Sequence, residues 1–140
     1  MELFDINKII ITTQKSFFDI DAIMAFLNNH SYWAGSRKTE TMKKAIDNSL
    51  CWAVLYNGKT IGFARVVTDY STVYYLCDVF VIPEFQNRGI GSRLLETVFN
   101  SEELDGLNGI LRTRDGHNLY KKYGFKNDQE IKDRFMFKRY

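Results

Sequence analysis

The segment 79–95 constrains the fold of this chain more than any other. An apolar run ends at Pro83, and a short polar stretch that contains Gly89 and Gly91 follows it. From Ile90 onward, apolar residues recur every three to four positions, which is the period of a helix that buries one face. The segment therefore predicts a strand, a glycine loop and a helix in direct succession.

The predicted loop has the properties of an anion site. Glycines let a ligand approach the backbone closely, and the first N–H groups of a helix have no acceptor within the helix. The helix macrodipole adds partial positive charge at the same end. Arg88 and Arg93 flank the loop and would add further charge. Because such sites commonly bind phosphate, we expect a phosphorylated ligand here.

Two common phosphate motifs do not fit this loop. No Gly-Lys-Ser/Thr follows the glycines, and Leu94 stands where a dinucleotide fingerprint has its third glycine. The run Gln86-Asn87-Arg88-Gly89-Ile90-Gly91 instead resembles the Gln/Arg-x-x-Gly-x-Gly/Ala motif of the GCN5-related N-acetyltransferases, the GNAT family. A second run, residues 119–125, is similar to the Leu-Tyr-x-x-x-Gly-Phe segment of that family.

The expected elements also resemble the plan of this family. Strands are expected at residues 6–12, 50–56, 60–68, 73–82, 107–111 and 135–137, with a hairpin turn at Asn57-Gly58. Helices are expected after Asp19 or Asp21, after Ser36 or Thr39, from the glycine loop to about Asn100, and at 115–123. Short turns force antiparallel pairing, whereas the later helical connections permit parallel pairing. We therefore expect one α/β domain, 1–140, with a mixed, mainly antiparallel twisted sheet of six to seven strands flanked by about four helices.

The resemblance implies that the chain is an N-acetyltransferase. Such an enzyme would move an acetyl group directly from acetyl-CoA to a primary amine of a small molecule or protein, without a metal. The glycine loop would hold the pyrophosphate, and the preceding strand would hold the pantetheine arm. The residues expected to bind the coenzyme are Val79, Phe80, Val81, Gln86, Asn87, Arg88, Gly89, Ile90, Gly91, Ser92, Asn118 and Tyr120. The alternative is a sensor or regulatory module that binds acetyl-CoA without turnover.

Two residues are candidates for the chemistry. Tyr120 matches the Tyr of the Leu-Tyr segment, so the resemblance implies that it donates a hydrogen bond to the departing thiolate; the alternative is core packing. Asp78 is the sole charged residue between Val73 and Ile82, and a buried carboxylate can serve as a general base. A structural role for Asp78, with deprotonation of the amine relayed through water, is the alternative.

The acceptor site is expected around the connector between the first two helices. Tyr32, Trp33 and Arg37 lie there, and Tyr74 lies near a hairpin turn. Aromatic rings would suit an apolar or cationic acceptor, and an arginine would suit a carboxylate. Packing of Trp33 in the core is the alternative.

Composition excludes several other functions. The net charge of +2, from 19 basic and 17 acidic residues, lacks the basic excess typical of nucleic-acid binding. No apolar run reaches the roughly 18 residues of a membrane span, and residues 1–5 lack the pattern of a signal peptide. We therefore expect a cytoplasmic protein with free thiols at Cys51 and Cys77. The sequence does not decide between a monomer and a homodimer.

Overall fold

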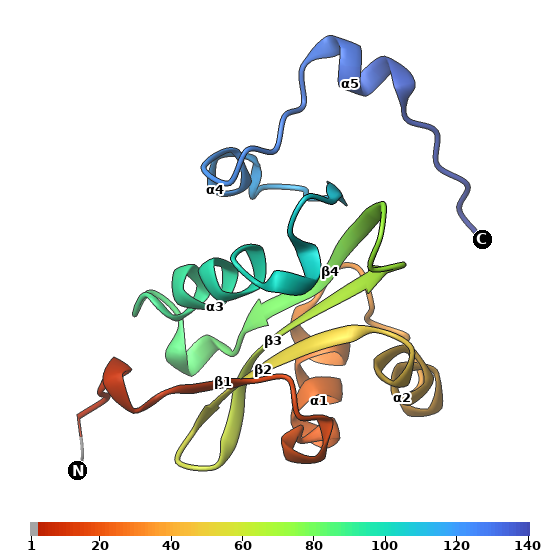
Figure 1. Cartoon of the computed structure of the whole chain (residues 1–140). Coiled ribbons are helices and arrows are strands. Elements are labelled where there is room, and N and C mark those ends of the chain that lie inside the picture. The colour runs from red at the N-terminus through yellow and green to blue at the C-terminus, as the bar shows by residue number, and fades with distance from the viewer. Residues whose placement is uncertain (1–2) are drawn as a thin grey trace.

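The computed structural model describes residues 3–140, which form one mixed sheet with helices on both faces (Figure 1). The strands are β1 (Ile10–Thr12), β2 (Leu50–Tyr56), β3 (Lys59–Thr68), β4 (Val73–Val81) and β5 (Asn108–Leu111), and they pair in sequence order. The helices are α1 (Ile20–His30), α2 (Thr39–Asp47), α3 (Ile90–Phe99), α4 (His117–Lys121) and α5 (Gln129–Arg134). Among the described residues, all pairings are antiparallel except the parallel pair β4 and β5. The predicted mixed, mainly antiparallel sheet is confirmed, with five strands rather than six to seven.

Each face of the sheet has its own hydrophobic core. The periodic apolar residues of α3, among them Leu94 and Val98, pack with Val54 and Val66 of the sheet on one face. The apolar residues of α1 and α2 cover the other face together with Phe63 and Phe80. Figure 1 shows this arrangement, with α3 on one side of the sheet and α1 and α2 on the other. The glycine loop therefore lies at the edge of the α3 layer, and the connector between α1 and α2 lies in the opposite layer.

Several local predictions are confirmed by backbone geometry. Asp19 caps α1, where its Oδ1 accepts a hydrogen bond from the Ala22 N–H at 3.1 Å. Asn57 and Gly58 both have positive φ, 50° and 77°, as the tightest hairpin turns require. At Gly124 the φ of 92° suits the glycine that follows the turn after α4.

Two predicted strands differ from the structure. The strand predicted at 135–137 is wrong, because these residues pair with no strand and Met136 is 98% exposed. The intervening α5, capped by the Asp128 carboxylate, carries the chain away from the sheet (Figure 1). The strand predicted at 6–12 is shortened to β1, because Asp5 accepts a hydrogen bond from the Asn7 N–H and starts a 3-10 turn at Ile6–Lys8.

Candidate active site

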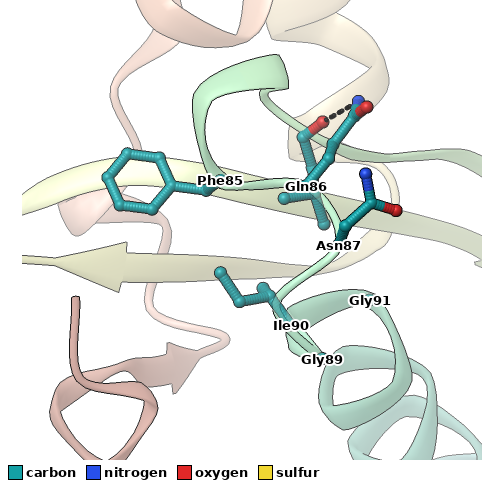
Figure 2. A pocket seen from close by; sticks show the side chains of 7 residues that line it. Phe85, Gln86, Asn87, Gly89, Ile90 and Gly91 are labelled. Carbon is teal, nitrogen blue, oxygen red and sulfur yellow. Dashed lines mark hydrogen bonds between the residues drawn. The ribbon is translucent and has the colours of Figure 1, made fainter.

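The glycine loop forms a hollow at the N-terminus of α3. Gly89 is the N-cap residue and has a φ of 83°, a left-handed conformation that glycine adopts without a steric penalty. The Arg93 N–H donates to the Gly89 carbonyl oxygen, so the amides of residues 90–92 come before the first helical hydrogen bond. A cavity of about 260 Å³ lies here (Figure 2), and it is lined by Val81, Phe85, Gln86, Asn87, Gly89, Ile90 and Gly91.

The side chains that line this cavity fix the conformation of the loop and carry no charge. Gln86 Nε2 donates to the Val81 carbonyl oxygen at 2.8 Å, which ties the loop to the end of β4 (Figure 2). Asn87 has a φ of 61°, so it also adopts the left-handed conformation. The Arg88 guanidinium lies over the rings of Phe4 and Phe85, 5.2 and 5.7 Å from their centroids. Arg88 thus lines a neighbouring hollow, whereas the first cavity lies at the N-terminus of α3, where the helix dipole adds partial positive charge.

Strands β4 and β5 separate next to this loop. Their parallel pairing runs from Val73 and Asn108 to Leu76 and Leu111, whereas β4 continues to Val81. The backbone of residues 77–81 on the β5 side is therefore not used in pairing with β5. Strand β4 therefore pairs with β5 over its first residues only, and it continues without β5 toward the glycine loop. Val79 and Val81 supply the backbone, and their side chains pack in the α3 core.

A bulge in β4 determines where Asp78 points. Arg65 of β3 pairs with Cys77, but Phe63 pairs with Phe80, so two residues of β4 face one residue of β3. Asp78 sits in this bulge with a φ of 50°, a left-handed conformation that is uncommon outside glycine. After the bulge the alternation of side chains is reversed, and Phe80 stacks on Phe26 of α1 with centroids 4.1 Å apart. The side chain of Phe80 thus packs in the core beneath α1. Its backbone alone lies on the β5 side of β4, beyond the last residue that pairs with β5.

The Asp78 carboxylate is buried among three donors. Oδ1 accepts from Trp33 Nε1 at 2.7 Å, and Oδ2 accepts from Arg37 and from Arg65 Nε, each at 2.7 Å. The side chain of Asp78 is 1% exposed. Two cations and one anion thus share a site in which both carboxylate oxygens are used.

Arg65 is the member of this cluster that sequence reasoning missed. It lies on the central strand β3 between Cys51 of β2 and Cys77 of β4, and its NH1 also donates to Ser49 Oγ. Both cysteines are free, and burial raises the pKa of Cys51 to about 12 and that of Cys77 to about 11. The signal was present in the sequence, because Arg65 is a charged residue inside an apolar strand, as Asp78 is.

The structure brings most of the predicted acceptor residues together. The Tyr32 and Trp33 rings meet edge to face with centroids 5.1 Å apart, and Trp33 and Arg37 both reach Asp78. Burial, with smaller effects from Tyr32 and Asp115, raises the pKa of Tyr120 to about 12. The phenol of Tyr120 therefore stays protonated, and able to donate, far above neutral pH.

Tyr74, Asn118 and Ser92 lie in different surroundings. Tyr74 is buried in the α3 core, and its ring covers Gly109 so closely that a Cβ there would lie 2.5 Å from it. It is therefore on the opposite face of the sheet from the Asp78 cluster. Asn118 is exposed in the first turn of α4, and Ser92 is exposed in the first turn of α3.

Known proteins share both the sequence pattern and the fold. A family model described as the acetyltransferase (GNAT) domain matches residues 47–127. The chain is 34% identical to the uncharacterized N-acetyltransferase ycf52 of Gracilaria tenuistipitata over 109 residues. This aligned region covers 72% of this chain and 60% of that protein. A crystal structure from Xanthomonas campestris, assigned to the same family, is 36% identical with a TM-score of 0.87, over 94% of this chain and 92% of that one.

A more distant structure, that of a GNAT acetyltransferase from Elizabethkingia anophelis with acetyl-CoA bound, shares the fold. Its TM-score is 0.64 at 22% identity, over 92% of this chain and 86% of that one. Among residues 3–140, each helix is too short or too polar to cross a membrane. The glycine loop, the separated strands and the family model agree: this chain belongs to the GNAT family of acetyltransferases.

Proposed function

We propose that this protein transfers the acetyl group of acetyl-CoA directly to a primary amine. The observation that carries the proposal is the hollow at the start of α3, next to the end of β4 where β5 has already separated. The free amides of residues 90–92 bind the pyrophosphate, and the backbone of residues 77–81 binds the pantetheine arm. This arrangement directs the thioester along β4, toward the cluster around Asp78.

Tyr120 stabilises the leaving thiolate in this proposal. Because burial raises the pKa of Tyr120 to about 12, its phenol is a weak acid compared with a thiol. It therefore acts by donating a hydrogen bond to the sulfur rather than by giving up its proton completely. An oxyanion that develops on the thioester carbonyl needs a further donor, and the backbone N–H groups of β4 beyond Cys77 supply it.

The acceptor amine lies against Tyr32 and Trp33, which are 53% and 39% exposed. An amine must be neutral to attack, and water can carry its proton away. We assign no base role to Asp78, since both of its carboxylate oxygens already accept hydrogen bonds from Trp33, Arg37 and Arg65.

A two-step assay tests this proposal. Calorimetry at low salt measures binding of coenzyme A and acetyl-CoA, and a thiol-release screen then offers polyamines, aminoglycosides, amino acids and peptides as acceptors. We expect binding of both coenzyme forms and release of thiol with one amine class. Binding without thiol release for any amine would favour the sensor module instead. No heat with either coenzyme form would reject the proposal.

A further inference from the structure

The Asp78 cluster connects to the loop before Tyr120 through a short series of contacts. The first link is the hydrogen bond from Trp33 Nε1 to Asp78 Oδ1, at 2.7 Å. This bond fixes the indole of Trp33, a residue that is 39% exposed at the surface. The carboxylate is itself held by Arg65 and Arg37, so the anchor of the series is rigid.

The second link runs from Trp33 to Tyr32. Their rings pack edge to face at 82°, a favourable geometry for aromatic pairs. The Tyr32 hydroxyl oxygen accepts a hydrogen bond from the backbone N–H of Arg114 at 3.1 Å, although 82 residues separate the two positions. The Arg114 guanidinium also lies 4.0 Å from the centroid of the Tyr32 ring. Tyr32 therefore joins the α1–α2 connector to the loop between β5 and α4.

The third link runs from this loop to Tyr120. Thr113 Oγ1 accepts a hydrogen bond from the Gly116 N–H at 2.8 Å. Gly116 is the N-cap of α4, and a Cβ added there would lie 3.1 Å from Tyr120 Cε2. The Tyr120 N–H donates to the Gly116 carbonyl oxygen at 3.1 Å, so Gly116 links the loop to Tyr120. A shift of the loop would therefore move the phenol that we propose donates to the leaving thiolate.

We propose that Asp78 is a positioning residue that holds the loop 112–116, and with it Tyr120, through Trp33 and Tyr32. The expected effect of Asp78 on catalysis rests on the proposed acyl transfer. The contacts that hold the loop do not depend on it. Loss of the carboxylate charge, as in Asp78→Asn, would weaken two ion pairs and the bond to Trp33 at once.

Nuclear magnetic resonance of the free protein tests this series of contacts. The two indole N–H groups, of Trp33 and Trp52, give separate signals, and Trp52 serves as an internal reference. In Asp78→Asn we expect a shift of the Trp33 indole signal and of the Arg114 backbone amide signal. In Trp33→Phe, which removes the donor but keeps a ring, the Arg114 amide should shift as well.

The control is Ser49→Ala, which removes a hydrogen bond to Arg65 but none of the contacts between Asp78 and Tyr32. It should leave the Arg114 amide in place. If Asp78→Asn fails to fold, Trp33→Phe carries the test alone. An unmoved Arg114 amide in a folded Trp33→Phe protein would overturn the proposal, whatever the enzyme assay shows.

A kinetic measurement separates positioning from base catalysis. With the fastest amine of the thiol-release screen, the kcat of Asp78→Asn should fall about tenfold at every pH, in parallel with the wild-type profile. Trp33→Phe should give a profile of the same shape. A loss of the acidic limb in Asp78→Asn alone would identify a base and overturn the positioning role. If no amine releases thiol, acyl transfer fails as a function, and the amide signals still decide the positioning role.

Discussion

The glycine loop and the Asp78 cluster are built from different parts of the chain, backbone in one and side chains in the other. The loop uses backbone: left-handed φ values at Asn87 and Gly89, and the amides at the start of α3. The cluster uses side chains that come from the α1–α2 connector, β3 and β4. Under the proposed function, the acetyl donor meets a fixed backbone surface, whereas the acceptor meets an arrangement of side chains. Substitutions should therefore affect the two regions by different rules.

The largest expected effect is on the cluster. Arg65→Met removes one of two guanidiniums from a carboxylate that is 1% exposed, so the free energy of unfolding should fall on the order of 3 kcal/mol. Urea unfolding measures the change. Arg37→Met is the matched comparison: its side chain is 21% exposed against 13% for Arg65, so water can replace more of its contact, and the loss should be smaller. Equal and small losses would mean that the cluster contributes little to stability.

The next effect is on the backbone of the loop. Gly89→Val places a β-branched residue at a φ of 83°, which should force the loop to rearrange and weaken coenzyme A binding at least about tenfold. Gly58→Val is the control, because Gly58 has a φ of 77° in a hairpin turn with no atom near its missing Cβ. Both variants lose stability, but calorimetry should show weaker binding in Gly89→Val alone. Equal affinities in the two variants would contradict a backbone site.

The sequence predicted the loop well because the loop is local. Proline, glycine and helical periodicity act within about ten residues of one another, and the structure places them as expected from Pro83 to Phe99. The cluster depends on contacts across 13 to 45 residues, and Arg65 could not be paired with Asp78 without the register of β3 and β4. The bulge at Asp78 could not be predicted from the sequence, because its left-handed φ is adopted by an aspartate and no glycine marks the position.

The strand predicted at 135–137 fails for a related reason. Phe135 and Phe137 have the propensity for a strand, but a strand forms only where a neighbour offers paired backbone groups. Tyr74 shows that local patterns are equally limited in predicting functional residues. Its place near a hairpin turn predicted an acceptor contact, whereas its burial against Gly109 follows from the pairing of β4 and β5. Local patterns therefore predicted elements, while partners across the sheet required the structure.

The pH dependence of Tyr120→Phe tests the proposed hydrogen bond from the Tyr120 hydroxyl to the leaving thiolate. Removing the hydroxyl should lower kcat about tenfold, the order expected for one hydrogen bond to a charged group, and leave coenzyme affinity within about twofold. Because burial raises the pKa of Tyr120 to about 12, the wild-type phenol remains a donor at pH 10. The ratio of wild-type to variant kcat should thus be constant from pH 7 to about pH 10. A ratio that halves near pH 10 would mean an ordinary phenol pKa, and so an exposed hydroxyl.

The smallest expected effect is that of the side chains of the glycine loop. Asn87→Gly removes the amide but keeps the left-handed backbone, whose φ is 61° and costs glycine nothing. Coenzyme A affinity should stay within about twofold, since the bound phosphates contact backbone amides and the helix N-terminus. Gln86→Ala is the informative neighbour, because it breaks the bond to the Val81 carbonyl oxygen and so loosens the backbone itself. A tenfold loss in Asn87→Gly would make the amide a direct ligand and end the contrast between the two regions.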